Sequence, residues 1–403
     1  MSGTVARGES RAVLSGTVLT AAGSLIYYLM PAYLGSVDRM LRVSPSSLGT
    51  LSAVEVWSIA LTSLFGPFWI ARFDWRLMVR IGAAIAFAGQ FASIWMTSFN
   101  LLLAVRIITG LAGEGLLLAL SFSILGQTRN VDRSFGMAMT ASVVMGTLCV
   151  YPAPQLDRAI GGNGVLAVLA ALALLAFAIS FIVPARVTKT LPVARAPASA
   201  SATRIPAIWR NLGILVLIAQ TIWFAGPGGF WAFSERIAAN NGMAADHVAQ
   251  AMALGMAAGL IGTILPTIFG DRFGRTGPIV LATLVMGVVI YRFGMAAGFA
   301  EGVVELVLFN VAWNYGSVYL FALACSFDTD GRIAVLLPAF QSIGLALGAF
   351  VVGHFVERFG YGVTPMVVGG FLIGAMALIA PGMARRRPRP SDADADTPTL
   401  ETA

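Results

Sequence analysis

Charged residues are scarce in this chain of 403 residues. Asp, Glu, Lys and Arg together make up 11% of it, whereas 58% of the residues are apolar and the mean hydropathy is +0.82. A soluble chain of this length could not cover its surface with so few charges. The composition therefore excludes a soluble globular protein and indicates a membrane protein.

The sequence also has little of what catalytic or metal centres need. It has two cysteines and two histidines, and it has no Cys-x-x-Cys pair. Cys149 and Cys325 both fall in apolar runs and are better interpreted as small buried thiols than as a disulfide or a metal site. No P-loop, His-Glu-x-x-His motif or nucleophile–base set occurs. We therefore expect neither an enzyme nor a cofactor or metal.

Long apolar runs are abundant instead, and each is long enough to cross a hydrocarbon core of ~30 Å as a helix. The sequence predicts twelve spans, at residues 13–34, 48–70, 80–97, 100–125, 135–155, 163–183, 211–233, 247–269, 278–298, 302–325, 332–354 and 363–383. The first follows Arg7 and Arg11, as a secretory signal does. It is too long for a signal core and lacks a clear cleavage site, so we expect it to be retained.

Basic residues are distributed unevenly between the two sides of the predicted membrane. Of the 26 Lys and Arg residues, Arg106 lies within a span and nineteen lie on the side of the termini. The other side has only six: Arg39, Arg42, Arg158, Arg236, Arg292 and Arg358. This bias predicts cytoplasmic termini in a bacterial inner membrane. The net charge of +7 then reflects topology and anionic lipid rather than nucleic-acid binding.

Residues 184–210 separate the sixth predicted span from the seventh. They are rich in Ala, Pro, Ser and Arg, and we interpret them as a flexible cytoplasmic linker. A cytoplasmic N-terminus (1–12) and a bundle of six helices (13–183) precede the linker. A second bundle of six helices (211–384) follows it, and the charged, Pro-rich tail (385–403) is expected to be disordered.

A short basic turn occurs at the same place in both halves. Asp271-Arg272-Phe273-Gly274-Arg275 follows the eighth span, and Ala71-Arg72-Phe73-Asp74-Trp75-Arg76 follows the second span, 200 residues earlier. A repeated turn between hydrophobic segments indicates internal duplication. Together with the two sets of six spans and the linker, it resembles the major facilitator superfamily over the chain to about residue 384. The resemblance implies an all-α fold of two pseudo-symmetric six-helix bundles.

In that family this turn latches the two halves on the cytoplasmic side. The resemblance implies that role for Arg72, Arg76, Asp271, Arg272, Gly274 and Arg275. The first copy departs from the family pattern, because Ala71 stands at the Asp position and Asp74 at the Gly position. Two further matches differ in quality. Arg106-Ile-Ile-Thr-Gly110 is similar to the family's pattern in span 4, whereas the antiporter motif of span 5 is reduced to Gly146 and Pro152.

Ionisable groups are costly inside a bilayer, so each one asks for an explanation. Glu55 and Arg106 fall at similar depths and could form a pair, which would be either a structural brace or part of the transport site. Glu114 lies near mid-membrane, where a carboxyl could gain and lose a proton as its exposure changes. We predict Glu114, with Glu55, as the proton-coupling carboxylates. Direct solute contact and helix packing are the alternatives for Glu114.

The family usually lines its central cavity with spans 1, 4, 7 and 10, and all four carry polar or aromatic residues here. The predicted solute-binding residues are Arg106, Tyr27, Tyr28, Gln220, Trp223, Asn310, Trp313 and Asn314. Asn can also join helices by hydrogen bonds, and Trp can mark the membrane interface. Gly226-Pro227-Gly228-Gly229 is expected to break or bend span 7.

These observations predict a secondary active transporter for a small organic solute, with a planar, aromatic or carboxylate compound as the favoured class. We expect proton-coupled uptake, with protons and membrane lipids as its other partners, and a monomer. A proton-driven efflux antiporter for drugs or metabolites is the main alternative. A transporter-like receptor that does not translocate is a third possibility, although neither the tail nor the linker contains a recognisable signalling domain.

Overall fold

The structure is a computed structural model that describes residues 2–70, 72–125, 128, 131–183, 207–269, 272, 274–295, 298–327 and 332–384. All regular elements within these residues are helices, as the apolar runs predict. The predicted linker and tail lie outside the described residues, except that the last four residues of the predicted linker belong to a helix.

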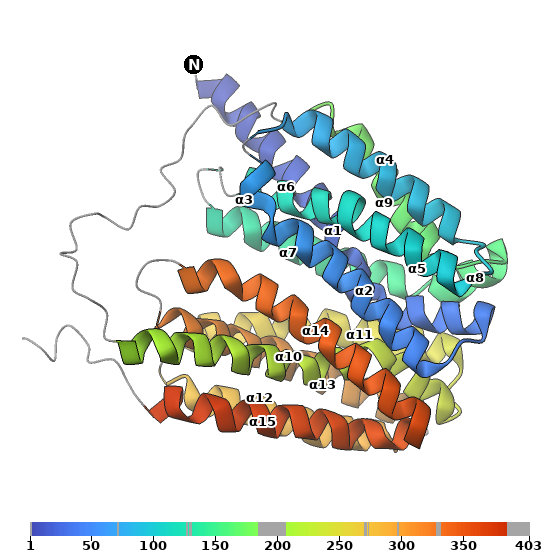
Figure 1. The fold of residues 1–403 in the computed structure, drawn as a ribbon, viewed down its shortest axis with the longest axis vertical. Coiled ribbons are helices and arrows are strands. Elements are labelled where there is room, and N and C mark those ends of the chain that lie inside the picture. The colour runs from blue at the N-terminus through green and yellow to red at the C-terminus, as the bar shows by residue number, and fades with distance from the viewer. Residues whose placement is uncertain are drawn as a thin grey trace, which may run out of the picture.

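The first half of the chain forms α1 (Ser2–Leu41), α2 (Pro45–Leu64), α3 (Gly66–Trp69), α4 (Trp75–Ser93), α5 (Phe99–Ile108), η1 (Thr109–Glu114), α6 (Gly115–Leu125), α7 (Val131–Val150), α8 (Ala153–Ile160) and α9 (Gly164–Ile179). The second half forms α10 (Ala207–Asn240), α11 (Ala245–Phe269), α12 (Thr276–Phe293), α13 (Phe299–Cys325), α14 (Arg332–Phe359), η2 (Tyr361–Val363) and α15 (Thr364–Ala384). Figure 1 shows the two halves lying side by side.

Nine helices of the described residues are long and apolar enough to cross a membrane. A tenth span results if α7 and α8, which meet at a bend of 53°, cross together. The predicted spans 80–97 and 163–183 coincide with α4 and α9. The helix α9 has only 16 residues, and α4 carries Arg76 and Arg80 near its start, so neither belongs to the nine.

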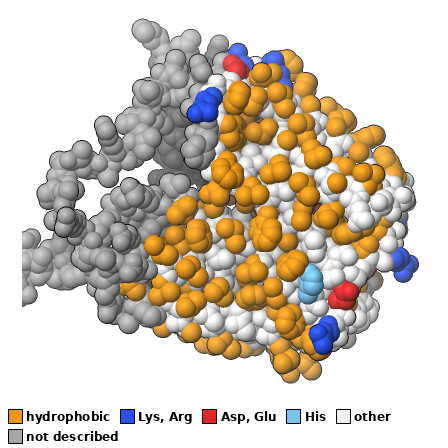
Figure 2. Space-filling view, in the orientation of Figure 1, with side chains coloured by type: hydrophobic (Ala, Val, Ile, Leu, Met, Phe, Trp, Pro, Cys, Tyr) orange, Lys and Arg blue, Asp and Glu red, His pale blue; other side chains and the backbone are white. Residues whose placement is uncertain are grey.

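Apolar side chains cover the face of the molecule that Figure 2 shows, and charged side chains lie near its margins. Many large apolar side chains are exposed, including Leu148, Met366 and Ile373. Water would not tolerate so much contiguous apolar surface, whereas lipid tails cover it at no cost. The chain is therefore a multi-pass membrane protein.

Each half has its own helix contacts. In the first half, α1 packs against α6, α7 and α9, while α4 packs against α9 and η1. In the second half, α10 packs against α14 and α15, and α13 packs against α11 and α12. Local capping sets some of the helix starts. The Ser44 hydroxyl accepts a hydrogen bond from the Ser47 amide at 3.3 Å, and Asp74 accepts one from the Leu77 amide at 3.1 Å.

The two halves meet mainly through α2 against α14, α7 against α11 and α1 against α10. Glycines permit the closest approach between α2 and α14. A Cβ atom on Gly49 would lie 2.5 Å from the Ala349 carbonyl oxygen and 3.2 Å from the Gly353 Cα atom. A Cβ atom on Gly146 of α7 would lie 2.6 Å from the Met256 side chain of α11. Gly49 thus lets α2 and α14 pack backbone against backbone, and Gly146 leaves room for the Met256 side chain.

A break at Gly226-Pro227-Gly228-Gly229, one of the two expected outcomes, is wrong, because α10 continues as a helix from Ala207 to Asn240. Close packing accounts for the glycines instead. Gly228 faces the backbone of Leu345, and Gly229 faces the backbone of Gly348, both on α14. Since a proline within a helix removes a single hydrogen bond, tight packing on α14 can hold the helix together through Pro227.

Candidate functional site

A charged cluster lies buried within the first half. The Arg106 guanidinium from α5 forms an ion pair with the Glu55 carboxylate from α2, and the Nε–Oε2 distance is 2.6 Å. A second guanidinium nitrogen, Nη2, donates to the other Glu55 oxygen, so the pair is bidentate. Both side chains have no exposed surface. The pair that the sequence suggested is thus confirmed, and it lies away from solvent.

Gln90 of α4 and Glu114 of η1 complete this cluster. Arg106 Nη1 donates to the Gln90 side-chain oxygen at 2.7 Å, and its Nη2 lies 3.3 Å from both Glu114 oxygens. The Gln90 side-chain nitrogen in turn donates to Glu114. Gln90 therefore links the guanidinium to the second carboxyl. We refer to Glu55, Gln90, Arg106 and Glu114 as the carboxylate cluster.

A π-helical turn explains how Glu114 reaches Arg106. In a regular α-helix, eight residues place two side chains about 80° apart around the axis. Residues Thr109–Glu114 form a π-helix, which adds one residue to the turn. Eight residues then cover about the rotation of seven, which leaves the two side chains roughly 20° apart. The irregular turn puts Glu114 and Arg106 on one face.

The cluster has one positive group and two acidic groups. With both carboxyls ionised its formal charge is −1, and with one proton it is neutral. Glu55 and Glu114 both face the Arg106 guanidinium, so two carboxyls share one cation. Because an uncompensated charge is costly in a buried site, the arrangement is chemically suited to bind and release a single proton.

Aromatic side chains of α10 and α13 gather near the place where α10 meets α1. The Trp231 ring lies 6.4 Å from the Phe309 ring and 6.3 Å from the Trp313 ring, measured between centroids. The Trp231 indole nitrogen donates to the Tyr27 carbonyl oxygen of α1 at 3.1 Å. These residues bring both halves together around uncharged polar and aromatic groups.

The other predicted solute-binding residues divide into two kinds. Trp223 and Gln220 are fully buried, and they donate to the Thr283 hydroxyl and the Leu337 carbonyl oxygen, respectively, both at 3.0 Å. Tyr27, Tyr28, Trp313 and Asn314 are partly exposed. Asn310 and Asn314 each donate to a carbonyl one turn earlier and lie against glycines of α11. In this conformation the two Asn side chains contribute to packing between α11 and α13.

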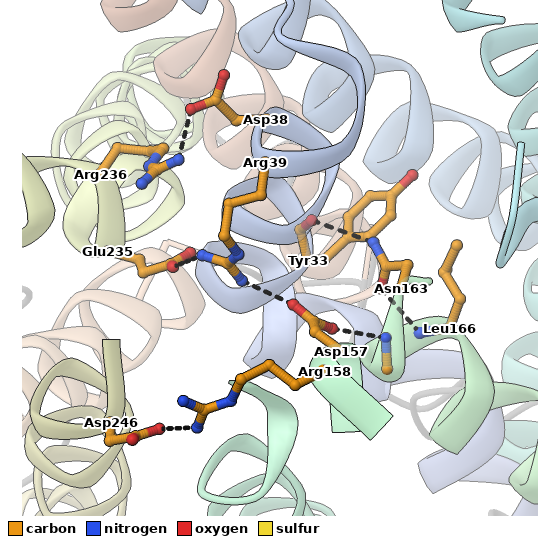
Figure 3. A network of polar contacts seen from close by, with 11 residues as sticks. Tyr33, Asp38, Arg39, Asp157, Arg158, Asn163, Leu166, Glu235, Arg236 and Asp246 are labelled. Carbon is orange, nitrogen blue, oxygen red and sulfur yellow. Dashed lines mark hydrogen bonds and ion pairs between the residues drawn. The ribbon is translucent and has the colours of Figure 1, made fainter. Parts of the chain in front are cut away.

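A network of ion pairs connects the two halves at the end of the molecule that carries α8 (Figure 3). Arg39 of α1 binds Glu235 of α10 at 2.5 Å, and Arg236 of α10 binds Asp38 of α1. The same Arg39 binds Asp157 of α8 at 2.8 Å. We call these residues, with the Arg158–Asp246 pair described next, the α8-end network.

The outermost member of this network is the Arg158–Asp246 pair, which joins α8 to α11 at 2.8 Å. Both side chains are exposed, so this pair adds little stability. The acid–base order is the same in Asp38-Arg39 and in Glu235-Arg236, and the two dipeptides pair reciprocally. This is the contact expected of two equivalent helices related by a two-fold axis.

The predicted latch residues are described only in part. Asp271 lies outside the described residues, as does Ala71. Arg72 and Arg272 are exposed, Gly274 has a positive φ of 64°, and Arg275 immediately precedes α12. Arg76 donates to the Val183 carbonyl oxygen at 2.7 Å and so braces its own half. The latch between the halves stays a prediction.

Sequence reasoning missed Gln90 and the α8-end network. A lone Gln in an apolar run was a detectable signal, since a buried amide needs partners. The repeated acid–base dipeptide near the ends of two long helices was also visible in the sequence. Within the described residues, no group of three or more His, Cys, Asp or Glu side chains is suited to hold a metal ion.

Comparison with known proteins places the fold. No family model matches the sequence, and no curated protein matches it significantly. A variant of the nucleoside transporter NupG superposes with a TM-score of 0.72 and 14% identity, over 92% of this chain and 99% of that chain. The chain therefore has the same fold as this solved transporter.

Two more structures with this fold are similar over nearly their whole length. A D-xylose-proton symporter superposes with a TM-score of 0.70 and 18% identity, over 91% of this chain and 96% of that chain. The xylose transporter XylE from E. coli, in an inward open conformation, gives a TM-score of 0.71 and 16% identity. The XylE match covers 95% of this chain and 98% of XylE. At such low identities the likeness concerns the fold.

Proposed function

We propose that this chain, with a major facilitator superfamily fold, is a secondary active transporter. It takes up a small organic solute together with protons by alternating access. The carboxylate cluster is the main support for the proposal. Its one guanidinium and two carboxyls have no net charge when the cluster binds one proton, so burial favours that state. The similarity to a nucleoside transporter and to a D-xylose-proton symporter supports a small solute as cargo.

The proposed topology has twelve spans in two six-helix bundles, with both termini in the cytoplasm of a bacterial cell. The bias of basic residues supports this orientation, and it puts the α8-end network on the outer side. Because this network joins the two halves on the outer side, it supports the proposal that the outer side is closed in this conformation. Opening it would expose the interface near Tyr27 and Trp313 to the outside, and the latch residues would then close the cytoplasmic side.

Within this mechanism, Glu114 is the residue that gains and loses the proton, and Glu55 keeps Arg106 neutralised throughout. The bidentate geometry supports this division, since Glu55 forms the shorter contacts with the guanidinium. Protonating Glu114 leaves an Arg106–Glu55 pair with no net charge. The protonated cluster can therefore accompany a rocking motion of the halves without carrying a buried charge.

The test is solute-driven proton movement in liposomes that contain the purified protein and a pH-sensitive dye. Solutes added outside should acidify the lumen of vesicles that contain the protein and leave protein-free vesicles unchanged. Glu114→Gln should abolish this acidification. Glu301→Gln is the matched control, because Glu301 is exposed at the start of α13. Alkalinisation would instead indicate efflux by antiport, and acidification that persists in Glu114→Gln would exclude this residue as the proton carrier.

A further inference from the structure

We infer that the transported solute is an uncharged molecule with a ring, and that organic anions are excluded. This inference rests on the proposed function, because it concerns the cargo of a proton-coupled carrier. It follows from the state of Arg106, from the charge of the carboxylate cluster and from the groups that remain partly exposed where the halves meet.

All three guanidinium nitrogens of Arg106 already bind side chains of the carboxylate cluster, which leaves little capacity for a carboxylate or phosphate on the solute. It is the only Lys or Arg side chain that is fully buried among the described residues. Its Nε and Nη2 atoms bind Glu55, and its Nη1 atom binds Gln90. The Tyr33 ring lies on another side, with its centroid 5.9 Å from the guanidinium carbon. The cation is thus already neutralised and enclosed.

Among the described residues of the second half, no other cation is placed to take over this role. The described Arg residues of α10 to α15 lie within about two turns of a helix end, as at Arg236, Arg292 and Arg358. An anion near the middle of the membrane would therefore meet the carboxylate cluster without a counter-charge. Like charges in a medium of low dielectric repel each other strongly.

Charge balance then selects between the remaining classes of solute. With one proton bound, the cluster is neutral, and a neutral solute keeps the loaded carrier neutral. An anion would leave a buried charge of −1 unless a second proton were bound. That second proton would remove the last counter-ion from the buried Arg106 guanidinium, which is costly. A cation would fit only the unprotonated cluster and would therefore exchange for a proton rather than travel with it.

The partly exposed groups at the interface suit an uncharged ring. Tyr27, Tyr28 and Trp313 offer aromatic faces, and Asn314 offers an amide. The Trp231 and Phe309 rings pack against Trp313, and the Phe309 and Trp313 ring centroids are 5.4 Å apart. Aromatic faces stack on planar rings, while phenol and amide groups bind hydroxyl and carbonyl groups of the solute.

The experiment uses two series of solutes that differ only in charge. One series is benzamide, benzoate and benzamidine. The other is phenyl glucoside, phenyl glucuronide and phenyl 6-amino-6-deoxyglucoside, which cross bare lipid poorly. Each compound is added outside liposomes that contain the wild-type protein and a pH-sensitive dye. Protein-free liposomes correct for benzoic acid that crosses the lipid unaided.

We expect protein-dependent acidification with the neutral member of a series and none with the carboxylate member of the same series. Acidification with a carboxylate would overturn it, and so would alkalinisation with an amine or amidine, since that shows cation–proton exchange. Proton movement with none of the six compounds would count against the proposed function itself. The two failures are therefore distinguishable, because only the first shows coupled transport of the wrong class of solute.

A second measurement separates solute charge from proton coupling. The solute that gives a signal is radiolabelled, and its exchange across the membrane is followed with equal concentrations on both sides. Glu114→Gln makes the carboxylate cluster permanently neutral, so the variant should lose solute-driven acidification and still exchange the neutral solute faster than the matching carboxylate. Loss of exchange in this variant, with exchange intact in Glu301→Gln, would show that the solute needs the negative charge and would contradict the inference.

Discussion

At the scale of single residues, Gln90 decides how the carboxylate cluster is connected. Its oxygen accepts from Arg106, and its nitrogen donates to Glu114, so one amide orients both groups. Gln90 is 1% exposed, and water cannot replace these hydrogen bonds without entering the helix packing. A hydrogen bond to a buried charged group contributes more than one between neutral groups.

The substitution Gln90→Leu keeps the side-chain volume roughly constant and removes both hydrogen bonds. An unsatisfied buried group costs about 1–3 kcal/mol, so we expect a lower melting temperature in detergent and weaker solute-driven acidification. Gln155→Leu provides the control, because Gln155 is exposed and its bond to Asp246 is long, at 3.3 Å. Equal melting temperatures and equal proton movement in the two variants would contradict the role of Gln90.

At the scale of the element, the π-helical turn and its glycines hold Glu114 in place. Two helices, α2 and α4, approach η1 closely because η1 has glycines at these contacts. A Cβ atom on Gly110 would lie 2.6 Å from the Ser58 side chain, and one on Gly113 would lie 2.9 Å from the Ala86 backbone nitrogen. Such contacts fix the turn between α2 and α4, which carry Glu55 and Gln90 of the carboxylate cluster.

We expect Gly113→Val to displace η1 from α4 and to separate Glu114 from Gln90. Overpacking of this kind costs about 1–3 kcal/mol, and proton coupling should fall more than solute exchange because only the cluster moves. Gly369→Val on α15 is the matched control, since a Cβ atom there meets nothing within 4 Å. The measurements are the melting temperature and the ratio of proton movement to solute exchange. An unchanged ratio in Gly113→Val would show that η1 does not position Glu114.

At the scale of the whole molecule, the α8-end network ties two equivalent helices together. Asp38 with Arg236 and Arg39 with Glu235 form a reciprocal pair across the halves. The Arg39–Glu235 pair is only partly exposed, so water screens it less than a surface pair. Separation of the halves at this end must break both pairs together, which makes the network a determinant of the closed state.

Asp38→Arg should open this end, because it places two Arg side chains against each other. The double variant Asp38→Arg with Arg236→Asp should close it again, since the pair is restored with its polarity reversed. Ser36→Cys, at a position that is 1% exposed, reports the opening by its rate of reaction with a maleimide. Cys149→Ser and Cys325→Ser remove the native thiols.

We expect several-fold faster labelling in the single charge variant and the original rate in the swapped pair. Asp74→Arg on the same background controls for the change in net charge, because Asp74 caps α4 away from this network. Labelling that stays fast in the swapped pair would indicate that Asp38→Arg acts through misfolding rather than through lost pairing. Equal labelling in all variants would exclude the network from closing the molecule.

Some features of this protein were determined by the sequence itself. Hydropathy is a sum over consecutive residues, so apolar runs such as 302–325 predicted α13 (Phe299–Cys325) closely. The repeated turn and the two sets of spans predicted the fold that the comparisons support. The ion pair of Glu55 with Arg106 was also predictable, because two opposite charges at similar depth in a bilayer have few alternatives to pairing.

Only the tertiary structure decided how these elements connect. Regular α-helical geometry puts Glu114 about 80° from Arg106, and the π-helical turn that aligns them depends on packing against α2 and α4. The same holds for Gly228, which packs against α14 where sequence reasoning predicted a break in the helix. The reciprocal ion pairs of Asp38 and Arg39 join residues almost 200 positions apart. Such contacts depend on how whole helices are placed relative to one another. A property summed over neighbouring residues, such as hydropathy, does not determine that placement.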